Sequence, residues 1–391
     1  MNYVFILGRQ PKLSLAELES VYGAKNLTQI SKDVAILDSE TEPKIERLGG
    51  TQKIAKKIGV ILGKSWDDAW PKIEKILLEK LKNNTSKCNV GMSVYGVKIA
   101  GKQLQNNMFG LKHALKKDYG VSVRTVGSGK IQLSSAQVLH NKLSLPPNTE
   151  VVVVYTKDSF TICQTIAIQD INSYSKRDHG RPQRDARVGM LPPKLAQIMI
   201  NLAMPSDSKT PVTLLDPFCG TGVVLQEAVL LGLDVIGTDI EQRMAQYSAQ
   251  NLHWLRGNYR FDGKLIYVKS ADARNYIWDE SVDVVVSETY LGPPLRHSPG
   301  INKLENIRNE VDQLLSKFLK NIHSQLKSGT RLCIAIPVWS TGRQAFHTKT
   351  VDHLESLGYT RLSFSHADSK DLIYRRFDQV VGRELLVLKK K

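Results

Sequence analysis

The 391-residue chain contains 41% hydrophobic and 24% charged residues, a composition that excludes wholesale disorder and collagen-like structure. At roughly 100–200 residues per domain, its length predicts two or three domains. No uncharged apolar run approaches the roughly 18 residues of a membrane span, so we expect a soluble, cytoplasmic protein that does not bind membranes. The 4 cysteines lie far apart and the 9 histidines show no ligand spacing, which predicts neither a disulfide framework nor a metal site.

The basic residues are concentrated in about a third of the chain. The sequence has 54 Lys and Arg residues against 38 Asp and Glu residues, for a net charge of +16. Residues 51–190 alone hold 23 basic and 10 acidic residues, a local charge of +13. A localised basic excess favours a polyanionic partner such as nucleic acid, contacted through its phosphates. A solvated basic face without a partner is the alternative.

Residues 1–65 alternate between strand and helix patterns and are expected to form a first small α+β domain. Ser14 lies at the expected N-cap of the first helix, and Glu17 follows it at capping-box spacing. The predicted elements are a strand at 3–7, a helix at 14–23, a strand at 35–38 and a helical region at 42–59 broken at Gly49 and Gly50.

Residues 66–171 predict a second α+β domain with a basic exterior. Its predicted elements are two helices around a strand at 89–97, and a hairpin of strands 151–156 and 159–168 that turns at Lys157 and Asp158. Residues 172–191 are polar and arginine-rich and lack periodicity, so we expect a connector. Its basic side chains could hold a phosphate backbone, with solvated linker charge as the alternative. They are Lys176, Arg177, Arg181, Arg184 and Arg187.

From residue 192 to the C-terminus the chain alternates regularly between apolar strands and helices. Near-continuous apolar strands joined by helices are what a parallel sheet covered on both faces requires. We therefore expect an α/β domain over 192–391 that begins with a helix at 192–203 and closes with a hairpin at the sheet edge. The predicted strands are 212–216, 233–239, 264–272, 282–288 and 330–337, followed by 359–367 and 379–390.

A glycine loop joins the first of these strands to a helix. The sequence Asp-Pro-Phe-Cys-Gly-Thr-Gly occupies residues 216–222, and its glycines permit a tight turn that approaches a ligand at a helix N-terminus. Leu225 stands where a nicotinamide-dinucleotide fingerprint needs glycine or alanine, and no Gly-Lys-Ser/Thr follows as in a P-loop. Both phosphate-cofactor interpretations are therefore disfavoured.

Three aspartates follow three successive strands. Asp216, Asp239 and Asp272 each end a predicted strand, so a parallel sheet would bring them to one edge. Carboxylates there can accept hydrogen bonds from an ammonium group, a ribose diol and an adenine amino group respectively. This combination of groups describes S-adenosylmethionine. Strand-end aspartates also serve as ordinary helix caps, which is the alternative.

Residues 172–391 resemble the class I methyltransferases, and among them the tRNA guanine-N2 methyltransferases that carry a THUMP RNA-binding domain. The segments that carry the resemblance are 189–203, 214–222, 237–241, 269–274 and 372–388. Residues 3–21 resemble that family's ferredoxin-like opening domain, and roughly 80–170 resemble THUMP more loosely. The resemblance implies a Rossmann-like methyltransferase sheet preceded by a ferredoxin-like and THUMP-like region, with S-adenosylmethionine as cofactor and tRNA as partner.

The resemblance also implies the parts of the cofactor site. Asp216, Gly220 and Gly222 would line the methionine part, Asp239 the ribose and Asp272 the adenine, while the helix after Leu191 closes the pocket. The implied cofactor site comprises Leu191, Asp216, Phe218, Gly220, Gly222, Asp239, Ile240, Asp272 and Ala273.

The catalytic motif departs from the family pattern. Where the family has Asp-Pro-Pro-Tyr, residues 287–294 read Ser-Glu-Thr-Tyr-Leu-Gly-Pro-Pro. An exocyclic amine is a poor nucleophile because its lone pair is delocalised into the ring, and acceptors bonded to its hydrogens shift that pair toward the methyl donor. Glu288 could be such an acceptor and Tyr290 a stacking face for the base. Alternatively, Glu288 caps the loop and Tyr290 packs in the core.

Nitrogen is the preferred target because a pyrimidine-C5 mechanism lacks its nucleophile. Cys219 lies inside the glycine loop, Cys333 lies within a strand, and no Pro-Cys follows the fourth strand. Arg375 and Arg376 fall in the turn between the last two strands. They are expected to contact phosphates, with a salt bridge to Asp378 as the alternative.

These features together predict an RNA methyltransferase. The N-terminal half would hold a folded RNA by its backbone and shape, while the C-terminal domain would accept an unstacked base. The methyl acceptor is expected to be N2 of a tRNA guanine, at position 10 by resemblance, and the protein is expected to be a monomer. Two alternatives remain: an amino-methyltransferase for rRNA or DNA, and a non-catalytic RNA-binding protein that lost its catalysis with the proline motif.

Overall fold

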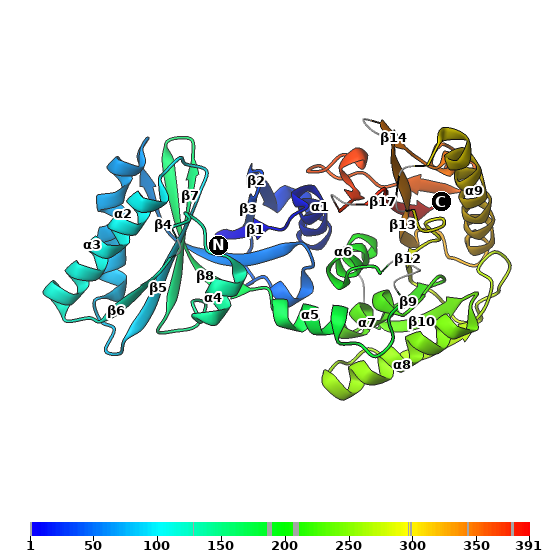
Figure 1. The fold of residues 1–391 in the computed structure, drawn as a ribbon, viewed down its shortest axis with the longest axis horizontal. Helices are drawn as coiled ribbons and strands as arrows, with labels where there is room; N and C mark the ends of the chain where they lie inside the picture. Colours follow the sequence, from blue (N-terminus) through cyan, green and yellow to red (C-terminus); the bar gives the residue numbers. More distant parts are fainter. Residues whose placement is uncertain are drawn as a thin grey trace. The chain divides into compact units, whose positions relative to one another are not determined.

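A computed structural model describes residues 2–127, 129–185, 190–205, 211–295, 297, 299–341, 344–376 and 379–391. The chain divides into two compact units (Figure 1). The first unit comprises Met1–Pro11, Lys25–Glu46 and Thr51–Ile171, and the second comprises Lys12–Ala24, Arg47–Gly50 and Asn172–Lys391. No helix of the described residues is both long and apolar enough to cross a bilayer.

The first unit is built on one eight-stranded sheet in the order β2-β3-β1-β4-β8-β7-β5-β6. Its strands are β1 (Asn2–Leu7), β2 (Leu27–Ser31), β3 (Val34–Asp38), β4 (Thr51–Leu62), β5 (Cys88–Tyr95), β6 (Val123–Val126), β7 (Thr149–Thr156) and β8 (Ser159–Ile168). Its helices are α2 (Trp66–Leu81), α3 (Gly101–Tyr119) and α4 (Ser135–His140). Helices α2 and α3 lie on one side of this sheet (Figure 1), and their apolar side chains share one core with β5, β7 and β8.

The helical region expected at 42–59 is wrong, because its second half forms strand β4. This strand pairs with β1 on one side and β8 on the other, so its backbone groups are satisfied along both edges. Sheet pairing and burial of this kind override local helix propensity. Because β4 joins the two halves of the sheet, a division at residue 65 separates no independent sheets. The hairpin at Lys157 and Asp158 is confirmed, and both turn residues have positive φ.

The first helix, α1 (Pro11–Tyr22), differs from its prediction at both polar positions. Ser14 does not cap it; this buried side chain donates to the Gly50 carbonyl oxygen at 2.7 Å. The Glu17 carboxylate accepts hydrogen bonds from the backbone N–H groups of Gly49 and Gly50, each at 2.8 Å, and from Asn201 Nδ2 at 2.7 Å. Burial raises the pKa of Glu17 to about 7 against the lowering effect of these donors. Glu17 therefore anchors α1 within the second unit.

The second unit contains a sheet in the order β11-β10-β9-β12-β13-β17-β15, with β14 paired to β13 and β16 paired to β17. Its strands are β9 (Thr213–Asp216), β10 (Asp234–Asp239), β11 (Leu265–Ser270), β12 (Val284–Glu288), β13 (Arg331–Thr341), β14 (Gln344–Phe346), β15 (Tyr359–Arg361), β16 (Ile373–Tyr374) and β17 (Val381–Lys390). Its further helices are α5 (Ile171–His179), α6 (Pro193–Ala203), α7 (Val223–Leu230), α8 (Gln242–Asn258) and α9 (Ile301–His323).

The predicted parallel sheet is confirmed, since β11, β10, β9, β12 and β13 run parallel. Side chains of β9 and β12 alternate between two cores, one shared with α6 and α7 and the other with α9. The final hairpin pairs as expected, but β17 lies between β13 and β15 rather than at the edge. The expected connector begins instead with helix α5.

Candidate functional site

The glycine loop lies at the carboxyl end of β9 and is held against β10. The Cys219 N–H donates to the Thr238 carbonyl oxygen at 2.9 Å. Gly222 has a φ of +80°, and a Cβ at this position would lie 2.2 Å from Ser248 Oγ of α8, so any other residue would strain the backbone and crowd this side chain. Helix α7 starts directly after Gly222 with no side-chain cap, which leaves its first N–H groups available to a ligand or water.

Asp216 is a buried carboxyl group at the centre of this edge. It is 2% exposed and accepts hydrogen bonds from Ser287 Oγ at 2.5 Å and from the Phe218 N–H at 3.2 Å. Burial raises the pKa of Asp216 to about 7, and the nearby Asp239 and Glu288 carboxylates act in the same direction. Within the described residues it has no cationic partner, so it is suited to receive one.

Asp239 connects the loops that follow β9 and β10. Its Oδ2 accepts the Gly220 N–H and its Oδ1 accepts the Glu241 N–H, both at 2.9 Å. Burial raises its pKa despite these donors. The neighbouring Ile240 side chain is 61% exposed. An acceptor that keeps free lone pairs beside an exposed aliphatic surface can hold a ribose diol and the flat face of a base.

Asp272 lies two residues beyond the end of β11 rather than within it. Its carboxylate receives Arg274 Nη2 at 2.6 Å, and this side-chain bond lowers its pKa. The adjacent Ala273 is buried and its carbonyl oxygen accepts Asn321 Nδ2 at 3.0 Å. The Ala271 N–H donates to the Asp239 carbonyl oxygen at 2.9 Å, which brings this loop to the same edge. The Arg274 contact was not predicted from the sequence.

The structure also places the two remaining implied cofactor residues in the cores beneath this edge. Leu191 is buried in the cluster that contains Cys219 and Val223. The Phe218 ring is half-buried and meets the Phe318 ring edge-to-face at 5.0 Å. The aspartates and the glycine loop are therefore brought together by hydrogen bonds, while Leu191 and Phe218 support them from below.

Glu288 ends β12 and forms an ion pair that the sequence did not reveal. Its Oε1 accepts a hydrogen bond from Arg383 Nε, and the two side chains are 13% and 5% exposed. Burial raises the pKa of Glu288, while Arg383 lowers it. Tyr290 keeps 37% of its surface exposed. Between them, Thr289 is buried and donates to the Ala335 carbonyl oxygen at 3.1 Å, so the motif holds its position without its prolines.

The basic residues expected to contact RNA fall into two groups. Arg177 is buried and pairs with Glu227 at 2.6 Å. Arg181 is also buried, and its Nε and Nη2 have no hydrogen-bond partner among the described residues. Neither guanidinium lies where a phosphate of a bound polymer could reach it. Lys176 and Arg376 are exposed and Arg375 is partly buried. Arg187 and Asp378 lie outside the described residues.

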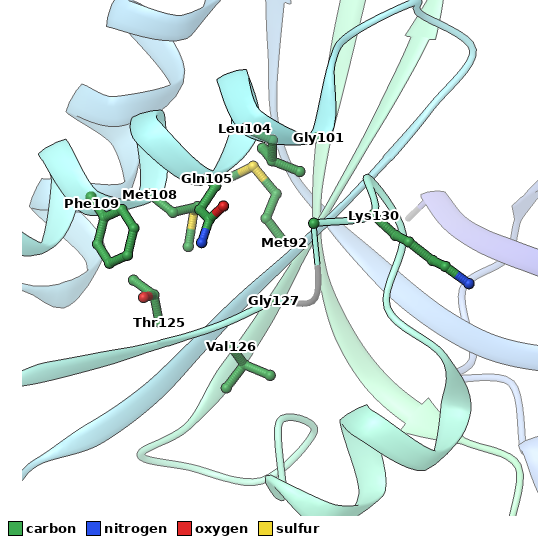
Figure 2. A pocket seen from close by; sticks show the side chains of 11 residues that line it. Met92, Gly101, Leu104, Gln105, Met108, Phe109, Thr125, Val126, Gly127 and Lys130 are labelled. Carbon is green, nitrogen blue, oxygen red and sulfur yellow. The ribbon is translucent and has the colours of Figure 1, made fainter.

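A separate pocket of about 210 Å³ lies in the first unit, between α3, β6 and the residues after β6 (Figure 2). A Cβ at Gly101 would lie 1.7 Å from the Gly129 carbonyl oxygen, so only glycine permits this close approach. Phe109, on α3, is 42% exposed. The lining residues are Met92, Gly101, Leu104, Gln105, Met108, Phe109, Thr125, Val126, Gly127, Gly129 and Lys130.

Comparison with known proteins relates the second unit to methyltransferases. The model of the family described as "UPF0020: RMKL-like, methyltransferase domain" matches residues 181–357, which include the glycine loop and the three aspartates. A relative from Methanothermobacter thermautotrophicus, named "tRNA (guanine(10)-N2)-dimethyltransferase", is 34% identical over 49% of this chain and 51% of its own length. The chain thus spans about half the length of this curated relative.

A second relative and a solved structure extend this result. The "Probable tRNA (guanine(10)-N2)-dimethyltransferase" of Methanothermococcus thermolithotrophicus is 32% identical over 32% of this chain and 74% of its own length. The crystal structure of TrmN from Thermus thermophilus aligns over 100% of both chains with a TM-score of 0.54 and 16% identity. This similarity confirms the expected class I methyltransferase fold, and the chain belongs to the tRNA guanine-N2 methyltransferase family.

Proposed function

We propose that this protein transfers a methyl group from S-adenosylmethionine to N2 of a guanine in tRNA, at position 10 by analogy with the names of its relatives. The observation that carries the proposal is the buried Asp216, which has no cationic partner among the described residues and which Ser287 connects directly to the motif that contains Glu288. A carboxyl group in this position matches the ammonium of an amino acid, and Asp239 beside it matches a ribose.

The donor set fits this cofactor part by part. Asp216 would hold the ammonium group, Asp239 the ribose and Asp272 the adenine amino group, with Ile240 against the adenine ring. When bound there, the cofactor supplies a methyl group on a positively charged sulfur. No phosphate-binding lysine accompanies the glycine loop, which agrees with a cofactor that has no phosphate.

The chain's own residues then orient the nucleophile. Tyr290 stacks on the flipped guanine, and Glu288 accepts a hydrogen bond from the exocyclic amine. With the cofactor held by Asp216, Asp239 and Asp272, its methyl group would be supplied to the amine nitrogen, and Glu288 would take up the N–H proton that the amine loses and pass it to solvent. When the amine donates its N–H hydrogen to the ionised Glu288 carboxylate, the hydrogen bond fixes the positions of the amine hydrogens. The amine lone pair is thereby directed toward the methyl group.

The first unit would hold the RNA. Its pocket combines apolar walls, the exposed Phe109 ring and the amide of Gln105, with Lys130 at the rim (Figure 2). An aromatic face, a polar group for base edges and a cation for the phosphate are the elements with which proteins bind an unstacked nucleotide. The local excess of basic residues over 51–190 supports a wider contact with the RNA backbone.

The function is tested by incubating the purified protein with labelled S-adenosylmethionine and tRNA, rRNA or DNA in parallel. Mass spectrometry of the digested nucleosides should then find N2-methylguanosine in tRNA. Label found only in rRNA or DNA would favour an amino-methyltransferase that acts on that nucleic acid instead of tRNA. RNA binding without any methyl transfer would identify a non-catalytic RNA-binding protein.

Cofactor affinity should depend on the ionisation of Asp216. Because the ionised carboxylate pairs with the ammonium group, and because its pKa is about 7, affinity should rise as pH increases through that value. Calorimetry between about pH 5.5 and about pH 7.5 should show tighter binding at the higher pH. Asp216→Asn should bind about tenfold more weakly at the higher pH and lose this dependence. An unchanged pH dependence in the variant would contradict this role.

The pocket of the first unit should contribute to RNA affinity but not to cofactor affinity. Phe109→Ala removes the stacking surface, so we expect tRNA binding about tenfold weaker in a filter-binding or fluorescence titration. Tyr119→Ala is the matched control, because Tyr119 is 43% exposed on the same helix and does not line the pocket. Equal losses in both variants would mean that the pocket has no specific part in binding.

A further inference from the structure

The Glu288–Arg383 ion pair spans three strands of the second sheet. Glu288 ends β12 and is in register with Ala335 of β13, while Arg383 of β17 is in register with Pro337 of the same strand. The two charged side chains therefore meet across β13, where Ala335 has only a methyl group. Both are largely buried, so the contact is formed away from bulk water and is weakly screened.

The pair uses only one oxygen of the carboxylate. Oε1 accepts the hydrogen bond from Arg383, whereas Oε2 accepts no hydrogen bond from the described residues. Oε2 is also not one of the fully buried polar atoms without a partner, so part of it is exposed. The side chain keeps 13% of its surface exposed. Oε2 is therefore partly accessible and keeps its full capacity to accept hydrogen bonds.

We propose that Arg383 is a positioning residue for methyl transfer: it fixes Oε1 of Glu288 and leaves Oε2 as the acceptor for an N–H of the target amine. This inference rests on the proposed function. In the family motif two prolines follow the acidic residue, whereas in this chain Thr289 and Tyr290 follow Glu288. An arginine whose guanidinium is planar and permanently charged can supply the missing constraint from a distant strand.

The charged groups around the carboxylate act in opposite directions. Arg383 on β17 favours the ionised form, whereas burial disfavours it. The negative charge of Glu288 raises the pKa of Asp216 on β9. Arg375 lies beside β17, because its Nε would be 3.0 Å from a Cβ built on Gly382. Arg383 is the cation that is hydrogen-bonded to Glu288, so replacing Arg383 with an uncharged residue should raise the pKa of Glu288.

The test compares Arg383→Met, Arg383→Lys and the unmodified protein in single-turnover methyl transfer to tRNA across a pH series. Arg383→Met should lower kcat by about 100-fold near neutral pH, leave KM for S-adenosylmethionine unchanged, and move the rising limb of the pH profile upward. Arg383→Lys keeps the charge without the fork of donors, so it should recover part of the rate and part of the shift.

Arg361→Met is the matched control. Arg361 pairs with Glu384 at 3.0 Å, with side chains 21% and 5% exposed, and residue 384 lies on the opposite face of β17 from residue 383. This variant loses a partly buried ion pair to the same strand, while Glu384 keeps His347 at 2.6 Å, so it should keep the pH profile of the unmodified protein. Thermal unfolding and cofactor calorimetry establish that each variant is folded.

The outcomes separate this inference from the proposed function. If the unmodified protein transfers no methyl group to tRNA, the proposed function fails and the inference fails with it. If the unmodified protein is active and both Arg383 variants keep its kcat and pH profile, only the inference is overturned. The same holds if Arg361→Met shifts the profile as much as Arg383→Met does. Should Arg383→Met fail to fold, the profile of Arg383→Lys decides.

Discussion

Replacing Glu288 by glutamine should lower the rate of methyl transfer by about 100- to 10,000-fold, the range expected when a positioned acceptor is lost from an acid–base step. Glutamine has nearly the same shape, but it carries no charge to accept the amine proton or to pair with Arg383. The loss should appear in the rate constant of the transfer step, because Glu288 forms no hydrogen bond to the glycine loop within the described residues. Single-turnover incorporation of labelled methyl groups into tRNA measures it.

Cofactor binding separates this effect from misfolding. Calorimetry should show that Glu288→Gln binds S-adenosylmethionine about as tightly as the unmodified protein. Glu355→Gln is the control, since Glu355 pairs with Lys391 and its side chain is 83% exposed. Turnover of Glu288→Gln equal to that of the control would remove Glu288 from the mechanism.

Arg177→Met should destabilise the second unit by about 3–5 kcal/mol, because it leaves Glu227 buried without its counter-charge. The Arg177 and Glu227 side chains are 8% and 3% exposed, and burial raises the pKa of Glu227 while Arg177 lowers it. Chemical denaturation followed by far-UV circular dichroism gives the free energy of unfolding. The effect concerns stability, because neither group reaches the surface.

A second substitution checks the cause. Arg177→Met with Glu227→Met removes both members of the pair, and Asp178 still acts on the neighbouring Arg181, so most of the lost stability should return. Lys82→Met is the surface control: its pair with Glu79 has side chains 33% and 57% exposed, and its loss should leave the unfolding midpoint unchanged. A double variant as unstable as Arg177→Met would show that packing, rather than charge, explains the loss.

The parallel strands of the second unit could be anticipated because their signals are local, whereas their order in the sheet could not. Each apolar strand is short and uninterrupted, and the glycines within residues 216–222 predict a tight turn there. Asp216 and Asp239 were identifiable for the same reason, since parallel strands place their ends at one edge. The position of Asp272 was predicted less accurately, because its strand ends two residues earlier than expected and its carboxylate pairs with Arg274.

The errors arose where a residue depends on a distant partner. Nothing near Arg383 in the sequence indicates Glu288, which lies 95 residues away along the chain. Glu17 matches a capping box locally, yet its donors come from residues 49, 50 and 201. Strand β4 carries a helix-like pattern but is held by pairing on both edges. Contacts of this kind are decided by tertiary packing, which local periodicity does not encode.

The anchoring of α1 has a consequence for how the chain is made. Leu13 and Ala16 of this early helix share a core with residues of α6 and α7, and Glu17 bonds Asn201, 184 positions later. As the protein emerges from the ribosome, the apolar face of α1 therefore stays exposed until α6 has been synthesised. A nascent chain in this interval offers a binding surface to chaperones, and a fragment ending at residue 171 would keep that surface permanently exposed.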